Sequence, residues 1–95
     1  MLLEWPGMDE RGYRDLMGAL ELGDAMFPGA VLHLAGPTGT GWRAVDVWDS
    51  PEAFERFRAE KLAPAMARVG LAAPELDAWP VANLAVAPGR PTSQG

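Results

Sequence analysis

The clearest pattern in the chain is an alternation of side chains between residues 42 and 48. In a β-strand, successive side chains point to opposite faces of the sheet. One face of this predicted strand carries Trp42, Ala44, Asp46 and Trp48, and the other carries Arg43, Val45 and Val47. The pattern therefore predicts a strand that places two tryptophans and a carboxylate on the same side.

A second strand, at about residues 30–35, is predicted just before the loop 36–41, which is rich in Gly and Pro. If Ala35 pairs with Trp42 across this loop, His33 lies opposite Ala44 and diagonal to Asp46. Diagonal neighbours in a sheet are about 7–8 Å apart. The hairpin therefore predicts that His33 and Asp46 meet through a hydrogen bond or through one water.

Two helices are predicted from their caps and apolar stripes. The first follows Asp9, a favourable N-cap residue, and is expected to end near Gly23. The second begins at Ser50, which is followed by a proline and a glutamate, and Gly70 is placed to end it. Pro64 lies inside this helix, where it lacks an N–H to donate, so we expect a kink there. The apolar stripe of the second helix consists of Phe54, Phe57, Leu62, Met66 and Val69.

The order of the predicted elements indicates the fold class. With further strands at residues 1–5 and 78–87, the order is β-α-β-β-α-β. Two βα units joined by a hairpin are typical of the ferredoxin-like α+β sandwich, in which two helices cover one face of a four-stranded antiparallel sheet. We expect one domain over residues 1–87 and a disordered tail over residues 88–95.

Composition excludes several classes of function. The 95 residues carry a net charge of −5 with scattered basic residues, so we expect no nucleic-acid partner and no membrane partner. The chain has no cysteine and one histidine, which argues against a zinc site, a two-histidine iron site or thiolate catalysis. No leader or membrane-spanning run is evident, so a cytoplasmic location is expected.

The two faces of the predicted sheet suggest a dimer. We expect the helices to cover the plainly apolar positions Leu32, Leu34, Val45, Val47 and Leu84. The opposite, open face is then expected to carry Val31, His33, Ala35, Trp42, Ala44, Asp46, Trp48, Trp79, Val81 and Asn83. Three tryptophans on a bare sheet would exceed the roughly 300–600 Å² of the largest apolar patch on a typical monomer. A second copy placed sheet to sheet would cover this face, so a homodimer is predicted.

His33 and Asp46 are the candidate catalytic pair. A carboxylate beside the imidazole would fix its tautomer and make it a usable general base near neutral pH. The alternative is a structural hydrogen bond that satisfies two polar groups at an interface. Tyr13 lies on the apolar stripe of the first helix, and we interpret it as a core residue rather than a catalytic one.

The remaining candidate residues would bind the substrate. Trp42, Trp48 and Trp79 would form the walls of a small apolar pocket, and Asn83 would orient a substrate carbonyl or hydroxyl. A dimer interface of packed tryptophans would also account for these residues without any ligand, and the place of Trp48 just before the helix cap suits an interface anchor. A pocket with room for a drug-sized molecule, about 300 Å³ or more, would favour binding or catalysis.

Several stretches of the chain also resemble a known family. They are Gly36-Pro37-Thr38, Gly41-Trp42-Arg43, Asp46-Val47-Trp48-Asp49-Ser50, Phe54, Leu62-Ala63-Pro64 and Trp79-Pro80-Val81-Ala82-Asn83. Together they resemble small proteins of the dimeric α/β-barrel superfamily, which includes proteins like the antibiotic-biosynthesis monooxygenases.

The resemblance implies a homodimer and a cofactor-independent, monooxygenase-like tailoring enzyme that acts on an aromatic or polyketide-like substrate. Cyclisation or isomerisation would use the same proton abstraction. The alternative is a dimer that binds a small ligand or is purely structural. Some members of the superfamily bind haem through one histidine, but we expect no cofactor and no metal here.

Overall fold

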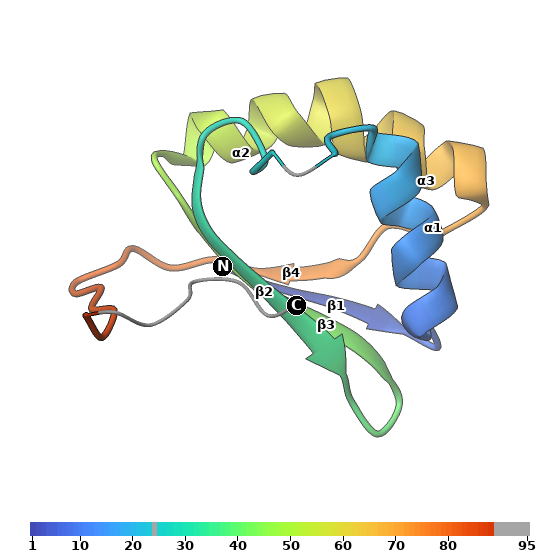
Figure 1. Ribbon diagram of the computed structural model, residues 1–95, viewed down its shortest axis with the longest axis horizontal. Coiled ribbons are helices and arrows are strands. Elements are labelled where there is room, and N and C mark those ends of the chain that lie inside the picture. Colours follow the sequence, from blue (N-terminus) through green and yellow to red (C-terminus); the bar gives the residue numbers. More distant parts are fainter. Residues whose placement is uncertain (24, 89–95) are drawn as a thin grey trace.

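The computed structural model describes residues 1–23 and 25–88 (Figure 1). The elements are β1 (Leu2–Pro6), α1 (Glu10–Leu20), β2 (Ala30–Pro37), β3 (Gly41–Trp48), α2 (Pro51–Phe57), the π-helical turn η1 (Arg58–Leu62), α3 (Ala63–Val69) and β4 (Glu75–Asp77). The strands form an antiparallel sheet in the order β2-β3-β1-β4. All the helices lie on one side of this sheet (Figure 1). The chain is therefore an α+β protein, and its strand order is consistent with the ferredoxin-like fold.

The two predicted N-caps, Asp9 and Ser50, are both confirmed. The Asp9 carboxylate accepts from the N–H of Gly12 at 2.8 Å, and the Ser50 hydroxyl accepts from the N–H of Ala53 at 3.0 Å. Gly70 ends α3 in the left-handed region, with φ of 74°. The predicted end of α1 near Gly23 is too late, because α1 ends at Leu20 and the next residue already has φ of 57°.

The irregularity expected at Pro64 takes the form of the π-helical turn η1, which directly precedes α3. The N–H of Ala63 donates to the carbonyl of Arg58, five residues back, instead of four. The spacing of the apolar side chains explains why a π-helical turn forms at this position. Phe57 and Leu62 are five residues apart, and a regular α-helix would separate them by about 140° around its axis. The wider turn lets both side chains reach the core, where each is about 4% exposed.

The prediction of which sheet face the helices cover is wrong. The core side of β3 carries Trp42, Ala44 and Asp46, which are 6%, 1% and 3% exposed. Leu34, predicted to be buried under the helices, is 53% exposed. The side of the sheet without helices, called the open face below, carries Leu2, Glu4, Leu32, Leu34, Arg43, Val45 and Val47.

Charge decides between these two orientations. One orientation buries Arg43 and the other buries Asp46, because the two residues lie on opposite faces of β3. Arg43 lies directly opposite Glu4 of β1 and forms an ion pair with it at 3.0 Å on the open face. In the core, the Asp46 carboxylate contacts the ring N–H groups of His33 and Trp48, and these hydrogen bonds offset the free-energy cost of burying its charge. Arg43 thus pairs with a carboxylate of the neighbouring strand β1.

The hairpin register also differs from the predicted one. Ala35 pairs with Ala44, and Pro37 pairs with Trp42, so the loop is shorter than the predicted segment 36–41. A bulge between Ala30 and Leu32 shifts the register near the start of β2. His33 therefore lies directly opposite Asp46 rather than diagonal to it.

The last strand is not where the sequence pattern placed it. β4 spans Glu75–Asp77 and pairs with Leu2–Glu4, whereas residues 78–88, called the C-terminal segment below, form neither a helix nor a strand. Pro80 has no N–H to donate to a sheet ladder, which disfavours a strand through it. Leu84, expected under the helices, is 44% exposed. Of the tail predicted to be disordered, residues 89–95 lie outside the described residues.

In the part of the chain that the structure describes, no helix combines the length and apolarity that crossing a lipid bilayer requires.

Candidate functional site

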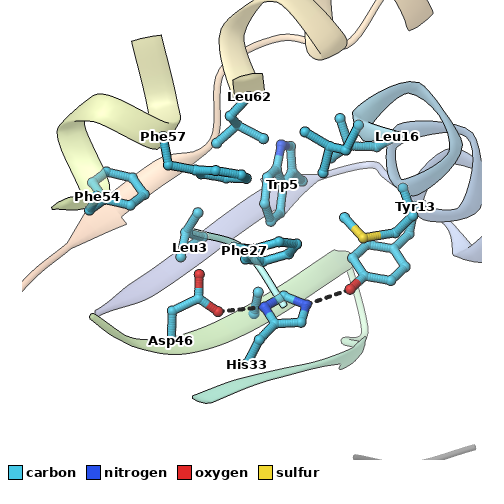
Figure 2. Close-up of a pocket in the computed structure, with 13 residues that line it drawn as sticks. Leu3, Trp5, Tyr13, Leu16, Phe27, His33, Asp46, Phe54, Phe57 and Leu62 are labelled. Carbon is cyan, nitrogen blue, oxygen red and sulfur yellow. Dashed lines mark hydrogen bonds and ion pairs between the residues drawn. The ribbon is translucent and has the colours of Figure 1, made fainter. Parts of the chain in front are cut away.

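The hairpin brings His33 and Asp46 together on the core side of the sheet (Figure 2). The distance from His33 Nδ1 to Asp46 Oδ1 is 2.5 Å. The predicted contact is therefore confirmed, although it lies beneath the helices instead of on the open face. The Asp46 side chain is 4% exposed and the His33 side chain is 17% exposed, so the pair is largely shielded from water.

Tyr13 is the third member of this group, and the sequence interpretation as a simple core residue missed its contact. Its hydroxyl oxygen lies 2.5 Å from Nε2 of His33 (Figure 2). Helix α1, which starts at the Asp9 cap, carries Tyr13 over the sheet, where its ring stacks on Trp42 at a centroid distance of 5.1 Å. The sequence signal for this contact is the polar hydroxyl of Tyr13 on the otherwise apolar face of α1. It predicts a hydrogen bond only when His33 is known to lie under that helix.

The environment keeps the Tyr13 phenol protonated. Burial, followed by the charge of Asp46, raises the pKa of Tyr13 to about 12 from the model-compound value of 10.0. In the tautomer of His33 whose Nδ1–H donates to the Asp46 carboxylate, Nε2 is the acceptor for the O–H of Tyr13. The indole N–H of Trp48 donates to the other carboxylate oxygen of Asp46 at 3.3 Å. The result is a continuous chain of hydrogen bonds, called the Tyr13–His33–Asp46 chain below.

Aromatic side chains surround this chain of hydrogen bonds. The ring of Phe27 meets that of His33 edge to face at a centroid distance of 4.6 Å (Figure 2). Phe27 also stacks on Phe57 at 4.8 Å and on Trp48 at 6.2 Å. This packing excludes water from one side of the imidazole and lowers the local dielectric constant.

A small cavity adjoins the site. Its volume is about 20 Å³, and its lining includes Trp5, Tyr13, Phe27, His33 and Asp46. That volume holds about one water molecule and is far below that of a drug-sized ligand. The indole nitrogen of Trp5, which lines the cavity, is buried without a hydrogen-bond acceptor among the described residues. The indole nitrogen of Trp42 is likewise buried without an acceptor among these residues, and such unpaired donors are unusual in a folded protein.

The predicted binding residues are only partly brought together. Trp42 is buried against Tyr13, and Trp48 contacts Asp46, so both lie at the site. The predicted interface would require both tryptophans to line the open face, and neither of them does. Trp79 and Asn83 belong to the C-terminal segment and are exposed, so the structure does not place them with His33 and Asp46.

A metal site would need several His, Asp or Glu side chains that converge on one point. Within residues 1–23 and 25–88, no group of three or more His, Asp or Glu side chains is positioned to hold an ion.

A scan against protein-family models, a search of curated proteins and a search of solved structures each find no match to this chain.

Proposed function

We propose that this protein is an enzyme that abstracts a proton from a small aromatic or polyketide-like substrate without a cofactor. The observation that carries the proposal is the Tyr13–His33–Asp46 chain, with a 2.5 Å separation at each of its two links. A partly buried imidazole held between a carboxylate and a phenol is suited to moving protons. The chemical class of the substrate comes from the resemblance and from the aromatic character of the cavity lining.

The proposed step uses all three side chains. Both nitrogens of His33 are engaged, so the substrate meets the phenol oxygen of Tyr13 first. The substrate gives a proton to this oxygen while the phenol proton moves to Nε2 of His33. The electron pair of the broken bond stays on the substrate as an enolate or phenolate, and the imidazolium faces the Asp46 carboxylate. Because the two transfers are coupled, no free Tyr13 phenolate is formed, whose pKa of about 12 would disfavour it.

The same step serves two kinds of overall reaction. Return of the proton to a different atom gives isomerisation or cyclisation. In the monooxygenase-like alternative, the deprotonated substrate itself reacts with molecular oxygen, and the protein supplies only the base and the position.

Access to the site requires a side chain to move, because an aromatic substrate does not fit into about 20 Å³. Phe27 is the residue we propose to move, since its ring packs edge-on against His33 at 4.6 Å. A substrate ring in its place would meet the same aromatic neighbours.

A second candidate function is that of a non-catalytic dimer, and the small cavity volume favours it. In this case the Tyr13–His33–Asp46 chain satisfies polar groups in the core and contributes to a unique packing arrangement. The two candidates make opposite predictions for proton exchange.

Deuterium uptake distinguishes them. The protein is incubated in D₂O with a β-diketone or a hydroxylated aromatic ketone, and exchange at the acidic carbon is followed by NMR. We expect exchange above the buffer rate, and a loss of about 10²–10⁴-fold of the enzymatic exchange in Tyr13→Phe and Asp46→Asn. Arg14→Gln is the matched control, because Arg14 is an exposed neighbour of Tyr13 on α1. Phe27→Ala tests access and is expected to increase binding of the probes.

Exchange at the buffer rate with wild-type protein and with Phe27→Ala would contradict catalysis. Equal enzymatic rates in Tyr13→Phe, Asp46→Asn and wild type would contradict the proposed roles of these residues.

On the strength of the resemblance, we also propose that two cytoplasmic copies associate through the open face to form a dimeric α/β barrel. Supporting this, the open face has an aliphatic centre made of Leu2, Leu32, Leu34, Val45 and Val47. These residues replace the tryptophans in the predicted interface.

A further inference from the structure

The C-terminal segment is an unusually apolar stretch of exposed chain. Residues 78–88 contain no charged side chain, and Asn83 is their only polar one. The exposed fractions of Trp79, Val81, Leu84 and Val86 are 51%, 48%, 44% and 48%. Since monomers seldom expose an apolar patch larger than about 300–600 Å², and one tryptophan alone offers about 150–250 Å², this segment calls for a partner surface.

The open face is the second uncovered apolar surface of the same chain. Leu34 in β2 is 53% exposed, and its cross-strand neighbour is Val45, which pairs in turn with Leu2. The Glu4–Arg43 ion pair closes one side of this aliphatic centre at 3.0 Å. Leu34 lies on the edge strand β2, and an uncharged segment packed against this edge of the aliphatic centre would leave no charge buried without a partner.

The geometry of the segment favours a different copy over its own sheet. β4 ends at Asp77, opposite Leu2, and the chain then runs away from the sheet (Figure 1). Pro80 holds the residue before it in an extended conformation, which opposes an immediate turn back. Eleven extended residues span about 36 Å, which is enough to reach the sheet of a second copy and to run across its four strands, about 14 Å from first to last.

We propose that the C-terminal segment of each chain packs along the β2 edge of the open face of a second copy, at Leu34, beside the area that the two sheets bury against each other. This inference rests on the proposed homodimer and adds the element that completes its interface. Each copy offers one segment and one open face. In a two-fold symmetric dimer, each segment therefore packs on the open face of the other copy, and no segment or face is left free to bind a third chain. Trp79 is the expected anchor, because buried aromatic residues dominate the energetics of such interfaces.

Crosslinking between chains tests the proposal directly, because the natural chain has no cysteine. Full-length Val81→Cys protein, labelled with a heavy isotope, is mixed with unlabelled Leu34→Cys protein and treated with a short thiol crosslinker. Mass spectrometry then counts heavy–light pairs. The matched control replaces Leu34→Cys by Met26→Cys, since Met26 is similarly exposed, at 47%, in the connection between α1 and β2. We expect the Val81–Leu34 pair to form several times faster than the Val81–Met26 pair.

Sedimentation of the uncrosslinked proteins separates this inference from the dimer itself. Trp79→Glu and Leu34→Glu are each expected to raise the dimer dissociation constant by about tenfold or more, and Met26→Glu is expected to leave it unchanged.

The results that would overturn the inference are distinct. A wild-type dimer with equal crosslinking at Leu34 and Met26 would show that the C-terminal segment does not pack there, although the homodimer would stand. A wild-type monomer at high micromolar concentration would refute both. A crosslink formed within one chain of a Leu34→Cys/Val81→Cys double variant, in a monomer, would show that the segment covers its own sheet. None of these outcomes affects the deuterium-exchange test of the Tyr13 site.

Discussion

Tyr13 is the single tyrosine of the chain, so its ionisation can be followed without assignment by the near-ultraviolet absorbance of tyrosinate. We expect the folded protein to titrate at pH of about 12 and the denatured protein at about the model-compound value of 10.0. The physical reason is that burial and the Asp46 charge both oppose the phenolate. Asp46→Asn removes the second of these causes, so it should bring the Tyr13 pKa part of the way back.

The same shift predicts how stability depends on pH. Because the folded-state pKa of Tyr13 lies above the unfolded value, the unfolded chain loses this proton first as pH rises. The contribution of Tyr13 to stability is thus complete below pH 10 and is lost between about pH 10 and 12. Two pKa units correspond to at most about 2.7 kcal/mol, and solvent screening of a half-buried group reduces this to about 1–2 kcal/mol.

Urea unfolding at a series of pH values measures this loss, and Tyr13→Phe is the control. The variant should lose about 1–2 kcal/mol less than the wild type between pH 10 and 12. Rapid pH jumps, with circular dichroism in parallel, keep the titration within the folded state. A native Tyr13 that titrates at about pH 10 would refute the reasoning, because neither burial nor Asp46 would then act on the phenol.

Three further substitutions, one of them with a matched control, test the fold through chemical denaturation. Ser50→Ala should cost about 1 kcal/mol through the loss of the helix cap, and an unchanged midpoint would mean that the cap contributes nothing. Gly41→Ala should cost about 2 kcal/mol or more, because its new methyl group would lie 2.3 Å from the carbonyl oxygen of Trp5. Gly39→Ala meets no atom within 4 Å and should stay within about 0.5 kcal/mol, so equal losses at the two glycines would contradict this account. Leu16→Ala, at a fully buried position, should cost about 2–5 kcal/mol, and a loss below about 1 kcal/mol would mean that the core there is not close-packed.

Local features of this chain were predictable from sequence because they depend on near neighbours. Asp9 and Ser50 cap helices by accepting from N–H groups three residues ahead, and Gly70 supplies a left-handed residue. The order of the elements and the sharing of one strand face by Trp42 and Asp46 likewise follow from short-range patterns.

The orientation of the sheet depended on a long-range pairing that no local pattern contains. Alternation shows that Arg43 and Asp46 lie on opposite faces but not which face meets the helices. The decisive fact is that Glu4 of β1 lies opposite Arg43. The predicted orientation of β3 places His33 on the face away from the helices, so it does not predict the contact between His33 and Tyr13.

The stripe of the second helix contained an unused indication of the π-helical turn. Its step of five residues, from Phe57 to Leu62, does not fit a regular α-helix, whose neighbouring core positions are three or four apart. The prediction of a last strand over residues 78–87 is wrong for a different reason. The apolar alternation around Trp79 favours a strand, but Pro80 has no N–H to donate to a sheet ladder.

The extra residue accommodated by η1 has a consequence for changes in chain length. Removal of one residue within 58–61, such as Ala59, would leave Phe57 and Leu62 four positions apart, the spacing of neighbours on an unbroken α-helix. Both would still face the core, so the chain should accept this deletion. Removal of one residue from β3 before Asp46 would instead turn the side chains on one side of the deletion to the opposite face of the sheet. Natural variants of different length should therefore differ in the second helix and keep the length of β3.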